Sequence, residues 1–172
     1  AIQEYVLQFH QQRIGQGDPI NPWKRLFDIL VAATGIILSA PFWLVCAFLI
    51  WIENPGPILF VKNSVTRGGF NFRQYKFRTM VRNAEELQNG LGGEDKDGNH
   101  TYKVRDDPRV TSFGRFLRRL SLDELPQLIN VLKGDMSLVG PRPERAVFVE
   151  KFRQQIPGYA QRHQVKAGIT GW

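Results

Sequence analysis

The stretch "LFDILVAATGIILSAPFWLVCAFLIWI", residues 26–52, decides the fold of this chain. From Ile29 to Ile52 no side chain is charged. A helix of that length would measure ~36 Å, which is longer than the ~30 Å hydrocarbon core of a bilayer. A domain of 172 residues has little core in which to bury so long an apolar helix. We therefore predict a membrane-embedded helix over residues 22–53.

Pro41 lies near the middle of this segment. Its ring removes the backbone hydrogen bond to Ile37, so we predict a kink or break in the helix. The Ser39 hydroxyl could satisfy the backbone carbonyls that are freed there. Basic residues flank the segment on both sides, with Lys24 upstream and Lys62 downstream. Because basic flanks favour the cytoplasmic face, a re-entrant helix satisfies both flanks, whereas a straight span leaves one outside. The sequence favours the re-entrant geometry and leaves the straight span open.

The composition restricts the partners. The net charge is +7, which favours nucleic acid, phosphorylated small molecules or an anionic membrane surface. Cys46 is the only cysteine, so an internal disulfide is excluded, and its apolar neighbours indicate a small hydrophobe. The three histidines (His10, His100 and His163) are isolated in the sequence, which predicts structural or surface roles.

The chain begins at Ala1 rather than Met and stops directly after "GITGW". Its first 20 residues contain no apolar core of a signal peptide. We expect a fragment of a longer protein, in which residues 1–21 are a linker or an upstream segment.

The remaining chain alternates strand and helix patterns. The runs "PILFVKN" (57–63) and "FNFRQYKF" (70–77) predict strands joined as a hairpin at Gly68-Gly69. The polar segment 92–102 predicts a surface loop. Helices are predicted over four further segments: 79–91, 112–120, 127–134 and 143–156. The third would end at Gly134, and the fourth would begin at Pro143. Phe148 and Phe152 of the fourth helix would face the core.

The helix "SFGRFLRRL" (112–120) allows two interpretations. Four apolar side chains recur at helical spacing, and the arginines point elsewhere; the four are Phe113, Phe116, Leu117 and Leu120. The helix could pack on the core from the surface, or it could lie in the membrane interface with its arginines at the lipid headgroups. Both interpretations remain open.

Two adjacent carboxylates follow this helix in "SLDELPQL" (121–128). Ser121 and Glu124 match a helix capping box, which requires no chemistry. A cap at Ser121, however, places Pro126 where a backbone hydrogen bond is lost, and a start at Leu122 or Asp123 avoids that cost. In either case the pair lies at a helix N-terminus, where carboxylates are stabilised.

Chemistry is the alternative interpretation of the same pair. Adjacent helical residues point ~100° apart, so Asp123 and Glu124 would have different roles. One could attack a phosphorus atom, and the other could hold Mg²⁺ on a diphosphate. In "GPRPE", the fixed φ angles of Pro141 and Pro143 would present Arg142 from a stiff turn, which suits bidentate phosphate binding.

Together these motifs resemble a known family. "KRLFDI", the apolar segment broken at "SAP", "YKFRTM", "DDPRVTSFGRFLRRLSLDELPQLINVLKGDMSLVGPRPE" and "AGITGW" occur in that order. The chain resembles the monotopic phosphoglycosyl transferases, the bacterial sugar transferase family, over residues 22–172. The resemblance implies a helix-rich α/β fold: a re-entrant membrane helix and a small cytoplasmic catalytic domain, residues 54–172, with a β-hairpin and interfacial amphipathic helices.

The resemblance also implies a reaction and its residues. A sugar-1-phosphate, from a hexose such as galactose or glucose, would move from a UDP-sugar to a polyprenyl phosphate with release of UMP. Asp123 would be the nucleophile that forms a covalent phosphosugar intermediate, Glu124 the Mg²⁺-side partner and Arg118 the active-site arginine. Six further residues are implied in substrate binding, namely Lys76, Arg78, Pro141, Arg142, Pro143 and Lys166, and Ser39 and Pro41 in the membrane break. The implied location is the cytoplasmic face of a bacterial inner membrane, as the first membrane step of polysaccharide assembly.

The sequence departs from the family at two points and leaves other functions open. Ala40 separates Ser39 from Pro41, and Lys166-Ala167 stands where some relatives have Arg-Pro. The expected partners are a UDP-sugar, polyprenyl phosphate and the bilayer, with no nucleic acid, and a homo-oligomer formed through an N-terminal region outside this chain. A membrane-anchored nucleic-acid- or anion-binding module and an inactive scaffold subunit are the alternatives. The acidic pair and the arginine turn favour the enzyme.

Overall fold

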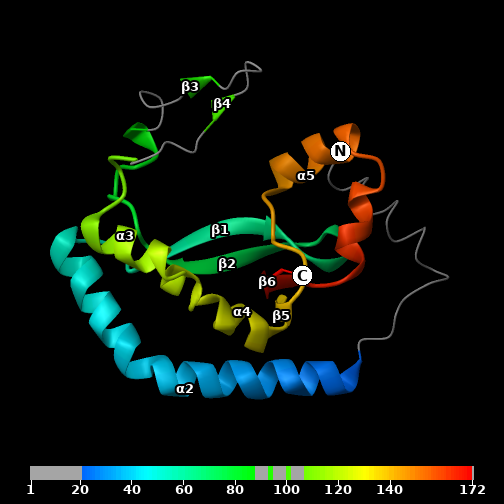
Figure 1. Ribbon diagram of the computed structural model, residues 1–172, viewed down its shortest axis with the longest axis horizontal. Helices are drawn as coiled ribbons and strands as arrows, with labels where there is room; N and C mark the ends of the chain where they lie inside the picture. The colour runs from blue at the N-terminus through cyan, green and yellow to red at the C-terminus, as the bar shows by residue number, and fades with distance from the viewer. Residues whose placement is uncertain (1–20, 88–92, 95–99, 102–106, 172) are drawn as a thin grey trace. The chain divides into compact units, whose positions relative to one another are not determined.

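The computed structural model describes residues 21–87, 93–94, 100–101 and 107–171 (Figure 1). The predicted linker therefore falls outside the described residues except for Asn21, and so does most of the predicted polar loop 92–102. The helices in chain order are α2 (Pro22–Glu53), α3 (Ser112–Arg119), α4 (Gln127–Lys133) and α5 (Ala146–Gln155). Short 3-10 turns are η1 (Arg67–Gly69), η3 (Leu122–Glu124) and η4 (Tyr159–Gln164).

The described strands form three two-stranded sheets. The hairpin joins β1 (Leu59–Val65) to β2 (Asn71–Phe77) through η1, where Gly68 and Gly69 both have positive φ, as the Gly-Gly turn predicted. Strand β3 (Gly93–Glu94) pairs antiparallel with β4 (His100–Thr101). Strand β5 (Met136–Val139) pairs in parallel with β6 (Ala167–Thr170). The helix-rich α/β class and the hairpin are confirmed.

The chain divides into two compact units. One comprises Ala1–Ala40, Val61–Lys76 and Pro126–Trp172, and we call it the strand unit because it holds β5 and β6. The other comprises Pro41–Phe60 and Phe77–Leu125, and we call it the α3 unit. The division passes through α2 between Ala40 and Pro41, so each half of that helix belongs to a different unit.

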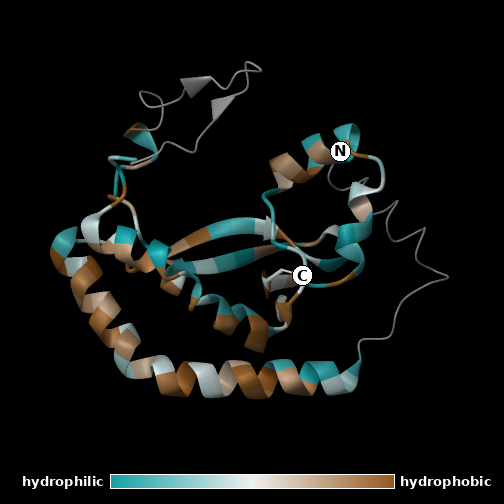
Figure 2. Cartoon of the chain, viewed as in Figure 1, coloured by the Kyte–Doolittle hydropathy of each residue, from teal (hydrophilic) through white to brown (hydrophobic). Residues whose placement is uncertain are grey.

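Helix α2 is, among the described residues, the one helix long and apolar enough to cross a membrane by length and composition. Hydrophobic residues predominate along its ribbon (Figure 2). Most of its apolar side chains are exposed, including Leu38 at 76% and Leu44 at 75%. A buried core helix of a soluble protein does not account for that exposure. The helix continues through Pro41, and the Ser39 hydroxyl donates to the Gly35 carbonyl (2.6 Å). Hydroxyl bonds of this kind accompany local adjustment of a proline-containing helix.

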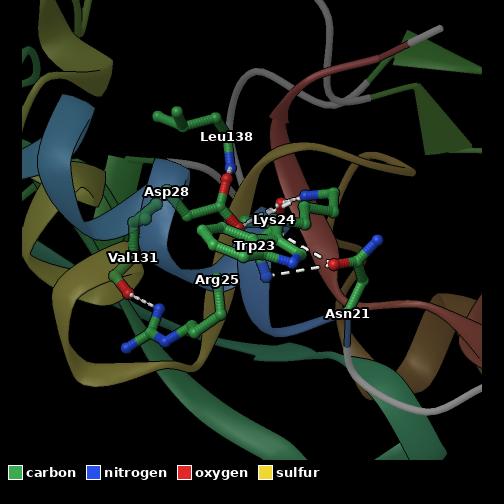
Figure 3. A network of polar contacts seen from close by, with 8 residues as sticks. Asn21, Trp23, Lys24, Arg25, Asp28, Val131 and Leu138 are labelled. Carbon is green, nitrogen blue, oxygen red and sulfur yellow. Dashed lines mark hydrogen bonds and ion pairs between the residues drawn. The ribbon is translucent and has the colours of Figure 1, made fainter.

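Within the strand unit, the first turns of α2 are bonded to β5 through a buried aspartate (Figure 3). The Asp28 carboxylate accepts hydrogen bonds from the Ser137 hydroxyl (2.8 Å) and the Leu138 backbone N–H (3.2 Å). The Lys24 ammonium also donates to Asp28 (3.2 Å) and supplies the opposite charge. Because a buried carboxylate is costly without such partners, this network defines one position for the start of α2.

Arg25 extends the same attachment to helix α4. Its guanidinium donates to the carbonyl oxygen of Val131 (2.6 Å; Figure 3) and to that of Leu132 (2.8 Å). These carbonyls belong to the last turn of α4, which carries the negative end of the helix dipole, and that of Val131 also accepts from the Gly134 N–H (3.0 Å). Helix α4 then ends at Gly134, whose φ of 92° needs a glycine, as predicted.

The α3 unit has its own apolar core. Cys46 and Ile50 from the second half of α2 pack with Phe77 and Leu117, and all four are buried. Trp43 meets Phe77 edge-to-face at 5.4 Å. The buried Cys46 confirms its predicted role as a small hydrophobe.

Three local predictions were wrong. The expected helix 79–91 is, over its described part, a β-bridge and turns, because the backbone around Met80 pairs with that around Val110 instead. Helix α5 begins at Ala146 rather than at Pro143, because the Glu144 carbonyl accepts from Val65 N–H (2.8 Å). Phe148 is exposed; Val149 is the buried residue of that helix.

Candidate active site

The acidic pair lies on a strained turn in the α3 unit. Ser121 ends the α3 segment in the left-handed region (φ 57°), the only positive φ of a non-glycine residue in the described chain. Asp123 and Glu124 follow in η3, both half-buried. A left-handed serine costs roughly 1–2 kcal/mol, and such strain concentrates at functional sites.

The capping-box prediction was wrong. Ser121 makes no side-chain cap bond, and its backbone accepts from the Glu124 N–H (3.2 Å) as part of the 3-10 turn. The alternative, a helix start at Leu122 or Asp123, is not seen as an α-helix either, because residues 122–124 form the 3-10 turn η3 and α4 begins at Gln127. Helix α4 begins only after Pro126, which has no N–H to contribute to an earlier α-helical turn.

Apolar packing holds the turn on both sides of the carboxylates. Leu122 and Leu125 flank the pair, and both pack against the buried core that contains Leu117. The leucines therefore determine where Asp123 and Glu124 lie in this unit.

Arg118 lies one helical turn before the pair, on the exposed side of α3. Its Nε donates to the Thr79 hydroxyl at 2.8 Å, which fixes the side chain from a segment distant in sequence. Thr79 is itself buried, and its carbonyl accepts from the Thr111 N–H (3.1 Å). Sequence reasoning missed Thr79, although it belongs to the "YKFRTM" motif that carried part of the resemblance.

Arg78 is buried at the end of α2 instead of projecting into solvent. Its guanidinium donates to the carbonyls of Ile50 (3.4 Å) and Asn54, and burial together with Arg82 lowers its pKa. The contacts described for Arg78 thus satisfy backbone carbonyls at the C-terminal end of α2. Its predicted role in substrate binding stays a prediction.

Helix α3 supports both interpretations of its apolar face. Leu117 is fully buried and Phe113 packs on the same core, as a surface helix requires. Phe116 and Leu120 remain 48% and 53% exposed on a helix that also carries exposed arginines. The interfacial location stays a prediction.

The arginine turn Pro141-Arg142-Pro143 lies in the strand unit. Its backbone is held at two consecutive carbonyls: that of Pro141 accepts from Gly168 N–H (3.0 Å), and that of Arg142 from the Arg162 guanidinium (2.7 Å). The exposed Arg142 side chain is therefore presented from a rigid backbone, as the two prolines predicted.

Two glycines allow this turn to approach β6. A Cβ on Gly168 would lie 2.1 Å from the Gly140 nitrogen, and a Cβ on Gly140 would lie 2.3 Å from the Lys166 carbonyl oxygen. Neither distance is compatible with a side chain, so the position of the turn depends on both glycines.

A shallow hollow lies beside the arginine turn. It is lined by residues of β1, the arginine turn and the segment around η4: Val65, Thr66, Pro141, Arg142, Arg162, His163, Val165 and Ala167. Arg162 also donates to the Tyr159 hydroxyl (2.7 Å) and lies over its ring at 4.9 Å. His163 is buried there, which agrees with the structural role predicted for it. Burial and Arg162 lower its pKa to about 4.

Lys76 and Lys166 fall into two different groups of charges in the strand unit. Lys76 and Arg142 each lie close enough to Lys62 to lower its pKa. Lys166 lies with Arg25 at the end of α4, where burial and Arg25 lower its pKa while Asp28 opposes the change. The contacts described for Lys166 therefore belong to the attachment of α2, and its part in substrate binding stays a prediction.

The structure thus places the predicted residues in two groups. Asp123, Glu124, Arg118 and Arg78 belong to the α3 unit, and the arginine turn, Lys76 and Lys166 belong to the strand unit. In the described residues no group of three or more His, Cys, Asp or Glu could hold a metal. Mg²⁺ commonly uses one or two carboxylates and the phosphates of its substrate, and the half-buried acidic pair fits that smaller donor set.

Comparisons with known proteins identify the family. The chain belongs to the bacterial sugar transferase family, whose family model matches residues 20–172. It is similar to a UDP-N-acetylgalactosamine-undecaprenyl-phosphate N-acetylgalactosaminephosphotransferase of Aeromonas hydrophila, with 46% identity over 95% of this chain and 37% of that protein.

Two further relatives are named for glucose. UDP-glucose:undecaprenyl-phosphate glucose-1-phosphate transferases of Escherichia coli K12 and Caulobacter vibrioides are 43% and 44% identical to the chain. The matches cover 87% and 86% of this chain, but only 30% and 51% of those proteins. The chain therefore spans between about a third and a half of the length of these relatives.

Proposed function

We propose that this chain is the catalytic part of a phosphoglycosyl transferase that moves a sugar-1-phosphate from a UDP-sugar to undecaprenyl phosphate. The observation that carries the proposal is the Asp123-Glu124 turn of a family member, held by two leucines beside the anchored Arg118. The names of the relatives support undecaprenyl phosphate as acceptor and UDP-sugars as donors. They include N-acetylgalactosamine as well as glucose, so the sugar remains open.

The proposed reaction has two displacement steps at one phosphorus atom. A carboxylate oxygen of Asp123 attacks the phosphorus that bears the sugar, the bond to the bridging oxygen of UMP breaks, and UMP leaves with that oxygen. A phosphate oxygen of undecaprenyl phosphate then attacks the same phosphorus and releases the Asp123 carboxylate. The products are UMP and undecaprenyl diphosphate-sugar.

The other residues take supporting roles in this proposal. Glu124 would hold Mg²⁺, which when bound neutralises charge on the diphosphate oxygens. Arg118 and Arg142 bind phosphate oxygens through guanidinium N–H groups, whose planar geometry suits them for bidentate contacts.

The decisive assay follows UMP release by the purified chain in detergent or nanodiscs, with undecaprenyl phosphate and a panel of UDP-sugars. Repeated release of UMP should need both substrates, whereas UDP-sugar alone should release at most one UMP per protein molecule. Asp123→Asn keeps the size and position of the side chain but removes the nucleophile, so it should abolish release without changing the melting temperature. Full activity of Asp123→Asn would exclude the assignment. Trapping the wild-type protein with UDP-sugar alone should add the mass of one sugar phosphate, and Asp123→Asn should add none.

We also propose that α2 is re-entrant and that the catalytic domain lies on the cytoplasmic face of a bacterial inner membrane. Asp28 bonds the start of α2 to β5, and Arg78 bonds its end near Asn54. Both partners follow α2 in the chain, and no second helix in the described residues is long and apolar enough to return across a membrane. The basic residues on both flanks support the placement of both ends of α2 on the cytoplasmic face.

Labelling tests this topology. Single cysteines replacing Trp23 and Asn54, in a Cys46→Ala background, should react with an impermeant maleimide from the same side of sealed vesicles. Labelling from opposite sides would establish a straight span.

A further inference from the structure

Three cations gather in the strand unit around a half-buried lysine of β1, which makes a group of four. Its members come from β1, from β2 and from the segment of the arginine turn, and we call it the Lys62 group: Lys62, Lys76, Arg142 and Arg145. Lys62 was not among the residues that the sequence assigned to substrate binding. Among the described residues whose charges act on Lys62, one is a carboxylate, that of Glu144.

The backbone holds these residues near one another. Strands β1 and β2 form one sheet and bring Lys62 and Lys76 to neighbouring strands. Val65 forms a bridge with Glu144, which attaches the segment between Arg142 and Arg145 to the end of β1. The Arg142 carbonyl is bonded to Arg162 in addition (2.7 Å). The gathering of positive charge is therefore a property of the fold and not of long, mobile side chains alone.

The position of Lys62 is unfavourable for its ammonium group. Burial lowers its pKa, Arg145, Lys76 and Arg142 lower it further, and Glu144 opposes them only in part. A half-buried cation among like charges destabilises the ligand-free fold, and such arrangements concentrate where a protein binds an anion. A phosphate group supplies several acceptor oxygens and negative charge to such a group of cations.

We infer that the Lys62 group is an oxyanion site and that Lys62 is a further phosphate-binding residue of this protein. The proposed function supplies the two phosphates that could occupy it, the diphosphate of the UDP-sugar or the phosphate of undecaprenyl phosphate. The chemistry is the same for both, and the inference rests on the proposed function only for the source of the phosphate.

Three variants test the inference. Lys62→Met removes the charge and keeps the length of the side chain, while Lys62→Arg keeps a charge. Lys133→Met is the matched control, because Lys133 lies in the same unit but pairs with Asp135 (3.7 Å) and lies over the Tyr75 ring at 5.3 Å. Each variant is purified as the full chain in detergent and compared with wild type.

The first measurement needs no turnover. Inorganic pyrophosphate and UDP should raise the melting temperature of wild type, Lys62→Arg and Lys133→Met, and Lys62→Met should bind both between about tenfold and a hundredfold more weakly. Without ligand, Lys62→Met should melt at the wild-type temperature or above it, because the substitution removes an unfavourable charge. A lower melting temperature for ligand-free Lys62→Met would show a structural role and overturn the inference. So would the failure of both pyrophosphate and UDP to stabilise wild type.

Steady-state kinetics then identify the source of the phosphate. If the site takes the diphosphate, Lys62→Met raises KM for the UDP-sugar and leaves KM for undecaprenyl phosphate and kcat nearly unchanged. If it takes the lipid phosphate, KM for undecaprenyl phosphate rises instead. Unchanged KM values for both substrates overturn the inference. Absence of UMP release by wild type would refute the proposed function, and the pyrophosphate titration would still decide the role of Lys62.

Discussion

The buried ring of His163 makes the stability of this protein dependent on pH in a calculable way. The ring is 4% exposed, lies beside Arg162 and meets the Tyr159 ring edge-on at 6.1 Å. Burial first, and Arg162 second, lower its pKa from 6.5 to about 4. The native protein therefore keeps this histidine neutral at pH values where the unfolded chain takes up a proton.

The sign and size of the effect follow from this difference. Protons bind more tightly to the unfolded state, so stability is complete above pH 6.5 and is lost as the pH falls toward 4. The full difference corresponds to roughly 3 kcal/mol at ~1.4 kcal/mol per pH unit. At pH 5 the loss relative to pH 7.5 should be about 2 kcal/mol, or about 4 to 8 °C in melting temperature for a domain of this size.

Thermal unfolding in detergent at pH 7.5 and pH 5 measures this contribution. Carboxylates of the chain also change protonation in acid, so the informative quantity is the difference in unfolding free energy between wild type and His163→Gln at each pH. The variant should lose stability at pH 7.5 through altered packing, yet recover about 2 kcal/mol relative to wild type at pH 5. His10→Gln, at a position outside the described residues, is the control and should follow wild type. A difference between wild type and His163→Gln that is independent of pH would refute the reasoning.

Three further substitutions test other parts of the structure. Gly168→Ala places a methyl group against the Gly140 backbone and should cost ~1–3 kcal/mol or more in unfolding free energy, with loss of UMP release; wild-type stability would contradict the close approach. Asp28→Ala should cost ~1–3 kcal/mol because it leaves the Ser137 hydroxyl and the Leu138 N–H without their acceptor, and Asp28→Asn should cost less; equal losses would show that the negative charge is unimportant. Arg109→Lys removes the two-nitrogen contact with the buried Asp107 and should lower the melting temperature by several degrees, which differential scanning fluorimetry would detect; an unchanged melting temperature would show that a single ammonium suffices there.

Much of the fold follows from local sequence patterns, because those patterns need no distant partner to form. The long apolar segment predicted α2, and the Gly68-Gly69 pair predicted the turn between β1 and β2. Gly134 predicted the end of α4 for the same reason, since a left-handed residue at that position needs no side chain. The family, and with it the acidic pair, was also identifiable from the order and spacing of motifs.

Only tertiary contacts decided the rest. The segment after Thr79 has a helical pattern, but its backbone hydrogen bonds go to the strand-like segment around Val110. Glu144 likewise uses its carbonyl for β1, and α5 begins later than its proline signal indicated. A pattern within one segment cannot reveal such competition, because the competing partner lies tens of residues away.

The same distinction applies to the candidate site. The sequence alone predicted different roles for the adjacent carboxylates and the presentation of Arg142 from a stiff turn. Tertiary structure decided that Arg78 closes the end of α2, that Thr79 anchors Arg118 and that Lys62 joins the basic residues around Arg142. The physical reason is that charge and hydrogen bonding act through space over a few ångströms, so their partners are chosen by the folded backbone and not by separation along the chain.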